Sequence, residues 1–226
     1  MAVDITNILE EIVDVLKNND IISTATRGVT RVTETFNGDG STVAFDLGND
    51  MVKNVKTISI GGTAQTYGTD YSTNYNAATS VVTFTSSPTS GSDNVSIQYD
   101  YSTSGDKIYP DYVRVDLSSS SFPRISVSYM GSESTPLGLG AGGVLTSPVI
   151  SISVYDRSEL NVNNYMDSIR STMLSNKTSC YNFKCILPIN TGPMMVMETS
   201  KGDEVLYRSS DFRIYLEKEW KWAIKN

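Results

Sequence analysis

The stretch NGDGST, which begins at Asn37, brings acidic and amide side chains together with glycines, as a cation-binding loop does. A calcium loop of the EF-hand type requires oxygen ligands at its first, third and fifth positions, glycine at the sixth and a bidentate glutamate at the twelfth. Counted from Asn37, the sixth residue is Thr42 and the twelfth is Gly48, so the pattern fails at both positions. The alternating segments on either side, 32–36 and 43–47, predict paired strands joined by a hairpin loop, in which Asn, Asp and Gly tolerate positive φ.

The sequence offers no set of catalytic groups at a diagnostic spacing. The chain contains no histidine, which excludes Ser-His-Asp and Cys-His arrangements within it and removes the commonest zinc ligand. The best remaining constellation is the scattered carboxylates Asp111, Asp116 and Asp156, for which surface carboxylates are the stronger explanation. We therefore expect no enzymatic activity, no cofactor and no metal site.

The two cysteines, Cys180 and Cys185, lie in the segment 180–187, whose composition predicts a strand. Their odd separation would place the two side chains on opposite faces of that strand, so a bridge between them would need a turn or a bulge. Buried free thiols are the favoured interpretation, and a disulfide to a neighbouring subunit is the alternative.

The charge balance limits the partners that the chain can have. Its 18 basic and 25 acidic residues give a net charge of -7, which argues against binding to a nucleic-acid backbone, because that requires clustered Lys and Arg. No run approaches the roughly 18 apolar residues of a transmembrane helix, and the N-terminus lacks a signal-peptide pattern. A soluble cytoplasmic protein without membrane contact is the default expectation.

Two amphipathic helices are predicted. Residues 3–18 carry apolar residues at helical spacing behind Asp4, a suitable N-cap, and residues 158–176 do the same behind Ser158. Because an isolated helix of this length is only marginally stable, the first helix must pack against another element.

Residues 26–105 are rich in Thr, Ser, Asn, Gly and Tyr and contain short alternating runs between turn signals, which predicts a small β-sandwich or barrel. The run Val95–Tyr101 alternates as a half-buried antiparallel strand does, with Asp100 on its polar face. The pair Gly61-Gly62 predicts a two-residue hairpin turn. Ordinary strand packing explains the tyrosines of this block, and stacking on sugar rings is the alternative: Tyr67, Tyr71, Tyr75, Tyr99 and Tyr101.

After residue 105, strands are predicted at 112–117, 123–130 and 148–156. The segment 131–147 between the last two is rich in glycine and has no periodicity, which predicts a long interaction loop that becomes ordered against a neighbouring ring. Its glycines do not form a phosphate-binding loop, because no Lys-Ser/Thr pair follows them. The candidate interface residues are the apolar ones that a solvated linker would not need: Leu137, Leu139, Val144 and Leu145.

The last third of the chain predicts further strands at 180–187, 193–199 and 203–220, the last with a bend or break near Ser209. The run Met194–Met197 is apolar on both faces. It therefore suits a central strand in the core, with a strand covered by a partner as the alternative.

Without residues 26–105, the predicted order of elements is helix, strands, long loop, strand, helix and strands. The segments PRISVSYMG and ISISVYDR occur in that order along this part of the chain. In this order the chain resembles the tail-terminator, or tail-completion, proteins of long-tailed phages and related viruses. The block with FNGDGSTVAFDL, VKTISIGG and VSIQYDY looks like a β-domain that recurs in phage virion proteins. The resemblance implies an α+β fold: a small sheet with helices on one face, built from residues 1–25 and 106–226, carrying an inserted all-β sandwich or barrel domain at 26–105.

The resemblance further implies a structural virion protein. Such proteins form a ring, usually of six subunits, at the head-proximal end of the tail, where they end tail-tube polymerisation and join the tail to the head. The implied partners are other copies of the chain, the tail-tube protein and the head-tail connector proteins, while genomic DNA passes through without specific binding. The implied location is the virion, after assembly in the host cytoplasm. Another head-tail adaptor or tail-tube component, and a glycan-binding adhesion module, are the open alternatives.

Overall fold

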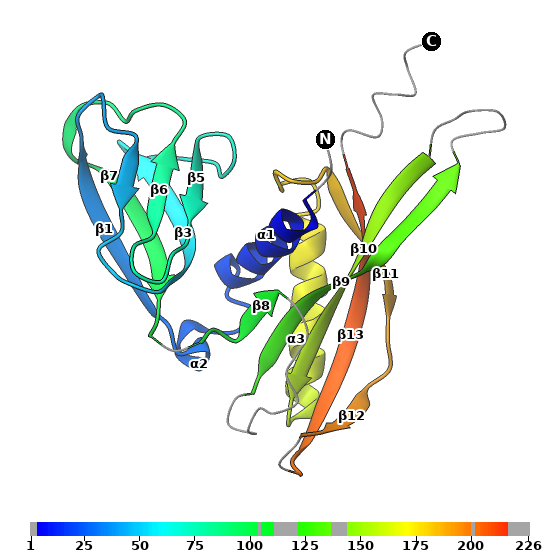
Figure 1. Cartoon of the computed structure of the whole chain (residues 1–226). Helices are drawn as coiled ribbons and strands as arrows, with labels where there is room; N and C mark the ends of the chain where they lie inside the picture. Colours follow the sequence, from blue (N-terminus) through cyan, green and yellow to red (C-terminus); the bar gives the residue numbers. More distant parts are fainter. Residues whose placement is uncertain (1–3, 104, 111–121, 137–143, 200–201, 217–226) are drawn as a thin grey trace. The chain divides into compact units, whose positions relative to one another are not determined.

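The computed structural model describes residues 4–103, 105–110, 122–136, 144–199 and 202–216 (Figure 1). The chain divides into two compact units. One consists of residues 22–106, and the other combines residues 1–21 with residues 107–226. The predicted strand at 112–117 lies outside the described residues.

The unit of residues 22–106 contains two antiparallel sheets, one with the strand order β1-β7-β3-β4 and one with the order β2-β6-β5. The short helix α2 precedes them. Buried side chains from both sheets form one core, among them Ile97 and Tyr99 of β7 and Phe45 and Phe84 of the smaller sheet. The elements are α2 (Thr24–Arg27), β1 (Thr30–Gly38), β2 (Ala44–Asp46), β3 (Val52–Ile60), β4 (Thr63–Ala64), β5 (Tyr71–Asn74), β6 (Val81–Phe84) and β7 (Gly91–Tyr101).

The hairpin predicted at Gly61-Gly62 is confirmed. The turn joins β3 to β4, with Ile60 opposite Thr63. Both glycines have positive φ, +56° and +82°, a conformation that glycine adopts without the steric cost that a Cβ would bring.

The stretch NGDGST contains a turn after the end of β1 at Gly38, but the strands on either side, β1 and β2, do not pair with each other. The Asp39 carboxylate accepts hydrogen bonds from the backbone N–H groups of Thr42 (2.6 Å) and Ser41 (2.7 Å) and from the Thr42 hydroxyl (2.7 Å). These bonds, above all the one from the Thr42 N–H, hold the pKa of Asp39 well below its usual range. Since β1 pairs with β7 and β2 pairs with β6, the expected hairpin is wrong. The loop carries the chain from one sheet to the other.

A buried cluster of charged side chains joins the two ends of this unit. The Arg27 guanidinium is 1% exposed. It donates to both carboxylate oxygens of Asp106 (2.9 and 2.7 Å), to Asp100 (2.8 Å) and to the side-chain oxygen of Asn54 (3.0 Å). Arg31 donates twice to the same Asp100 carboxylate, at 2.7 and 3.0 Å. Asp100 is therefore fully buried, although its place in the alternating pattern predicted a solvated side chain.

The other unit is built on a six-stranded sheet with the order β11-β13-β10-β9-β8, and β12 also pairs with β13. Neighbouring strands are antiparallel except β8 and β9, which are parallel. Its elements are α1 (Ile5–Asn18), β8 (Ile108–Pro110), β9 (Arg124–Pro136), β10 (Val144–Asp156), α3 (Glu159–Ser175), β11 (Cys185–Thr191), β12 (Met195–Glu198) and β13 (Glu204–Tyr215).

Both predicted helices are confirmed. Asp4 caps α1 by accepting a hydrogen bond from the Thr6 N–H (3.0 Å), and Ser158 caps α3 by accepting one from the Asn161 N–H (3.4 Å). Helix α1 packs on β8 and β9, and α3 packs on β10, β11 and β13. The side chains that these elements bury are apolar and include Ile8, Ile12, Leu16, Ile125, Val127, Ile150, Ile152, Val154, Val162, Met166, Ile169, Phe212 and Ile214.

The expected fold class is wrong. In the described structure, 48% of the residues lie in strands and 19% in helices. The described strands form three sheets in which most neighbouring strands are antiparallel. This is not a small sheet with helices on one face carrying an inserted domain. The expectation failed because β9, β10 and β13 are each single strands of 12 or 13 residues, whereas their Ser, Gly and Pro residues suggested shorter strands and loops.

We predict that Arg27→Met destabilises the unit of residues 22–106 by about 3–5 kcal/mol, because it leaves the buried Asp100 carboxylate with fewer partners. Urea unfolding, with hydrogen exchange of peptides from this unit as the local readout, measures the effect. The control is Arg157→Met. Arg157 is exposed and makes a single 3.4 Å contact with Asp203, so its loss should cost about 1 kcal/mol or less. Equal effects of the two substitutions would contradict the prediction.

Candidate interaction surface

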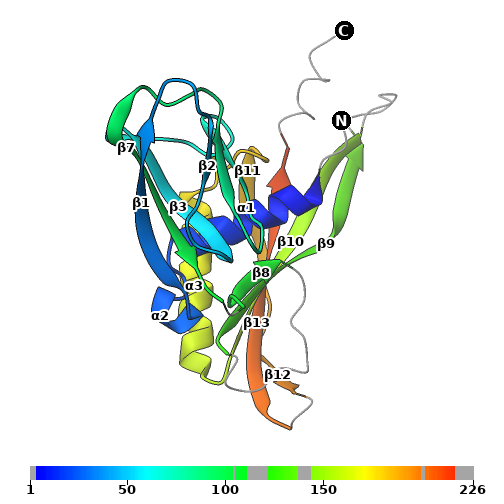
Figure 2. The ribbon, with the colours of Figure 1, turned by 60° about the vertical axis from the view of Figure 1, so that its left-hand side comes forward.

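The segment 131–147 is largely a strand pair, so the expectation of a 17-residue loop without structure is wrong. Residues 131–136 of β9 and 144–148 of β10 pair with each other, from Gly131 opposite Val149 to Pro136 opposite Val144. We call these two segments the arm. β13 pairs with β10 only from Val149 onward, and β8 pairs with β9 only at 125–127, so no described strand flanks the arm. Figures 1 and 2 show the upper ends of β9 and β10 diverging from β13.

The structure places two of the four predicted interface residues. Val144 and Leu145 belong to the arm, where they pair with Pro136 and Thr135. Leu137 and Leu139 lie outside the described residues. A contact between these four residues and a neighbouring ring stays a prediction.

The other side of the sheet ends in β11 and β12, which follow each other along β13. We call residues 185–197 the apolar edge, because this run contains no Asp, Glu, Lys or Arg. Four of its large apolar side chains are exposed: Leu187 (38%), Ile189 (46%), Met195 (48%) and Val196 (61%). The core interpretation of Met194–Met197 is therefore wrong, since β12 is an edge strand with β13 on one side only among the described strands. The alternative, a strand covered by a partner, stays open.

Two arginines lie where β11 ends and the chain turns toward β12. Arg170 of α3 donates to the Thr191 hydroxyl (2.7 Å). Arg208 of β13 donates to the Gly192 carbonyl and to the Asn163 side-chain oxygen, both at 2.9 Å. All of these acceptors are neutral. Among the described residues, no carboxylate forms an ion pair with either guanidinium, so the apolar edge has two positive charges beside it.

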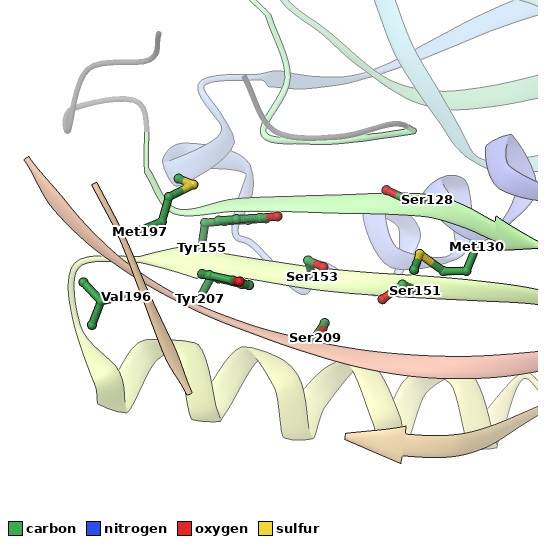
Figure 3. Close-up of a pocket in the computed structure, with 9 residues that line it drawn as sticks. All are labelled: Ser128, Met130, Ser151, Ser153, Tyr155, Val196, Met197, Tyr207 and Ser209. Atoms are coloured by element: carbon green, nitrogen blue, oxygen red, sulfur yellow. The ribbon is translucent and has the colours of Figure 1, made fainter. Parts of the chain in front are cut away.

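A groove of about 460 Å³ lies on the sheet face that carries Ser151 and Ser153, opposite to the face that carries the buried Ile150 and Ile152 (Figure 3). Its lining residues come from four strands: Ser128, Met130, Ser151, Ser153, Tyr155, Val196, Met197, Tyr207 and Ser209. Because Val196 and Met197 belong to β12, the groove continues into the apolar edge.

Small side chains form the floor of the groove. Ser151 of β10 lies opposite Ser128 of β9, and Ser153 of β10 lies opposite Ser209 of β13, so the lining serines stand side by side on adjacent strands. At one end the rings of Tyr155 and Tyr207 are stacked, with centroids 5.4 Å apart, and Figure 3 shows their hydroxyl ends pointing toward the serines. The lining residues carry no ionisable carboxylate or amine, so the groove offers contact area and neutral hydrogen bonds rather than acid-base chemistry.

Of the three carboxylates considered for catalysis, the structure describes only Asp156. Asp111 and Asp116 lie outside the described residues. Asp156 is buried and accepts hydrogen bonds from the Ser158 N–H (2.9 Å) and the Asn161 amide (3.4 Å), so it stabilises the start of α3. Within the described ranges, no group of three His, Cys, Asp or Glu side chains is arranged to hold a metal ion.

The tyrosines considered for sugar stacking mostly serve packing. Tyr71 and Tyr99 are buried in the core of their unit. The Tyr99 hydroxyl accepts a hydrogen bond from the Asn49 amide (2.7 Å), and the Tyr75 hydroxyl accepts one from the Val55 N–H (3.0 Å). The packing interpretation is confirmed for Tyr71 and Tyr99, whose rings are not available to an external sugar.

Comparisons with known proteins return no family model that matches the chain and no curated protein that is significantly similar to it. In the described part of the chain, no helix combines the length and the apolar character needed to cross a membrane. The function proposed below therefore depends on the surfaces of the molecule.

Both cysteines are free and half-buried, but only Cys185 lies in a strand, because β11 begins there. Cys180 follows the end of α3, and its sulfur lies 3.9 Å from the Asn176 carbonyl oxygen. Burial, together with the nearby Glu11 carboxylate, raises the pKa of Cys180 to about 12.

We predict that Cys180 reacts more than tenfold more slowly with iodoacetamide at pH 8 in the folded protein than in urea. The thiolate is the reactive form, and a raised pKa lowers its fraction at any pH below that value. Mass spectrometry of the labelled peptides measures the rates, and the folded-state rate should keep increasing above pH 9. A folded-state rate equal to the rate in urea would contradict the prediction.

Proposed function

We propose that this protein is a structural component of a virion. In this proposal it assembles into a ring at the head-proximal end of a tail, where it ends tail-tube polymerisation and joins the tail to the head. The observation that carries the proposal is a pair of sheet borders that no other described strand flanks, the arm and the apolar edge.

The arm supports assembly because of its energetics. A two-stranded hairpin outside a sheet is marginally stable by itself, and its outer N–H and C=O groups are open to pairing with another chain. The sheet gives it an anchor, since Glu133 in the arm forms an ion pair with Arg213 of β13. A projecting arm of this kind gains stability when it lies against a neighbouring subunit.

The charge distribution supports the same role. A chain with a net charge of -7 repels its own copies, so contacts between copies are most favourable where charge is absent. Within the unit that combines residues 1–21 with residues 107–226, the two longest runs without a charged residue are 134–155 and 185–197. They contain most of the arm and the whole of the apolar edge. The other unit also contains two such runs, 57–69 and 71–92.

The fold itself contributes nothing to this proposal, because the architecture implied by the terminator resemblance is not the one observed. The alternative role of another ring-forming tail component, such as a head-tail adaptor or tail-tube subunit, would use the same surfaces. Whether the protein stops tube growth distinguishes the two roles.

We predict that the purified full chain forms closed rings of a single size that are visible by electron microscopy. We expect each ring to contain six subunits. Light scattering should give the matching mass, and addition of the rings to growing tail tubes should halt elongation. Protein that stays monomeric at high concentration, and that tail tubes do not recruit, would overturn the proposal. Rings that form but leave tube growth unchanged would favour the adaptor role.

We also predict that the double substitution Leu137→Ser and Leu139→Ser leaves folding unchanged but weakens capping of tail tubes at least tenfold. The reason is the loss of apolar contact area, because apolar side chains at these positions would not be needed in a solvated linker. Circular dichroism checks the fold, and tube-length distributions check the capping. Normal capping by this variant would show that these leucines are not part of an interface.

A further inference from the structure

We propose that the apolar edge is the docking surface for a second copy of this chain, and that the second copy meets it with a different, acidic part of its surface. The inference rests on the proposed function, because both require copies of the chain to assemble. It goes further by assigning the residues and the type of contact.

The first argument is the geometry of the edge. Residues 185–191 and 195–198 have β13 on one side, and no other described strand pairs with them. An exposed sheet edge is a template for pairing with another chain, and soluble proteins usually protect such an edge with charged residues. This edge has none between Cys185 and Met197, and instead exposes Met195 and Val196.

The second argument is the cost of desolvation. Moving charged side chains out of water costs free energy unless each finds a partner. The apolar edge contributes no such cost on its own side of the contact, and its apolar area contributes favourably when it is buried. The groove beside it adds a floor of serines, which are small enough to let another chain approach closely.

The third argument is charge complementarity. Arg170 and Arg208 bind only neutral acceptors within the described structure, so the junction between β11 and β12 carries positive charge in a chain whose net charge is -7. The field at this junction attracts acidic surfaces. Another copy carries an excess of acidic over basic residues, 25 against 18, which makes a second copy a suitable occupant.

The same arginines argue against a two-fold contact. If two copies joined through the same edge, the four guanidinium groups would approach one another, and like charges repel. A contact between the apolar edge and a different surface is therefore favoured. Such a heterologous contact generates a closed ring when the rotation between subunits closes.

The test uses the full chain with two matched substitutions. Val196→Glu places a carboxylate in the middle of the apolar edge, and Val43→Glu makes the same change at a valine that is 39% exposed in the unit of residues 22–106. Sedimentation velocity over a concentration series measures assembly, and circular dichroism with thermal melting checks that each variant folds. We expect Val196→Glu to raise the dissociation constant for assembly at least 100-fold and Val43→Glu to change it less than threefold.

A second variant tests the charge argument without touching the edge itself. Arg170→Gln keeps a hydrogen-bond donor for the Thr191 hydroxyl but removes the positive charge. We expect it to weaken assembly about tenfold at 50 mM salt and about twofold at 1 M salt, because salt screens the attraction. Lys56→Gln, an equal loss of charge in the other unit, should show no such salt dependence.

The outcomes separate this inference from the proposed function. Rings that persist unchanged in Val196→Glu would overturn the inference and leave the ring role standing. A wild-type chain that stays monomeric would overturn both. A wild-type chain that forms only two-fold dimers, dissolved by Val196→Glu, would support the edge as a docking surface but overturn the heterologous contact and the ring.

Discussion

The bidentate ion pair between Arg27 and Asp106 is the constraint on which the organisation of the chain depends. The chain leaves one unit after residue 21 and returns to it at residue 107, so the two ends of the intervening segment must lie close together. Arg27 and Asp106 stand at those two ends, and their hydrogen bonds of 2.9 and 2.7 Å hold them there. Because of this closure, α1 and β8 can belong to the same packed unit although 89 residues separate Asn18 from Ile108.

The closure also explains why a carboxylate is buried in the middle of β7. The Asp100 carboxylate accepts hydrogen bonds from both Arg27 and Arg31, and burial of any of these groups without the others would be costly. The cluster therefore acts as a unit. The hydrogen bonds of the cluster fix the positions of α2, β7 and the segment at Asp106 relative to one another. Apolar contacts alone would fix these positions less specifically, because they have no preferred direction.

The second unit distributes its polar and apolar residues in an unusual way. One face of its sheet carries Ile150 and Ile152 into the core, while the other carries serines and a shallow groove. Its two borders, the arm and the apolar edge, lack charge almost entirely. A protein that must remain monomeric protects sheet borders with charge. The absence of that protection on both borders is the physical basis for our proposal that this unit assembles with copies of itself.

The sequence by itself determined the local elements, because these depend on short-range periodicity and on capping and turn residues. Asp4 and Ser158 located the helix starts, and Gly61-Gly62 located a hairpin, since each of these residues acts on backbone groups within a few positions. Only the tertiary structure decided which strands pair. Alternation is the same for a strand in either sheet, so the loop at Asp39 could be identified as a turn but not as a crossing between sheets.

The same limit applies to the surface. The run Met194–Met197 is equally apolar in a core strand and in an edge strand. The difference comes from whether β12 has a second neighbour on the side away from β13, which no local pattern encodes. The glycines and the single proline of 131–147 concealed the arm, because pairing with a neighbouring strand overrides the low strand propensity of Gly131 and Pro136. Asp100 was assigned to solvent because its partner Arg27 lies 73 residues away in the sequence. Long-range contacts of this kind form only when the chain has folded, and they decided the position of every surface on which the proposed assembly depends.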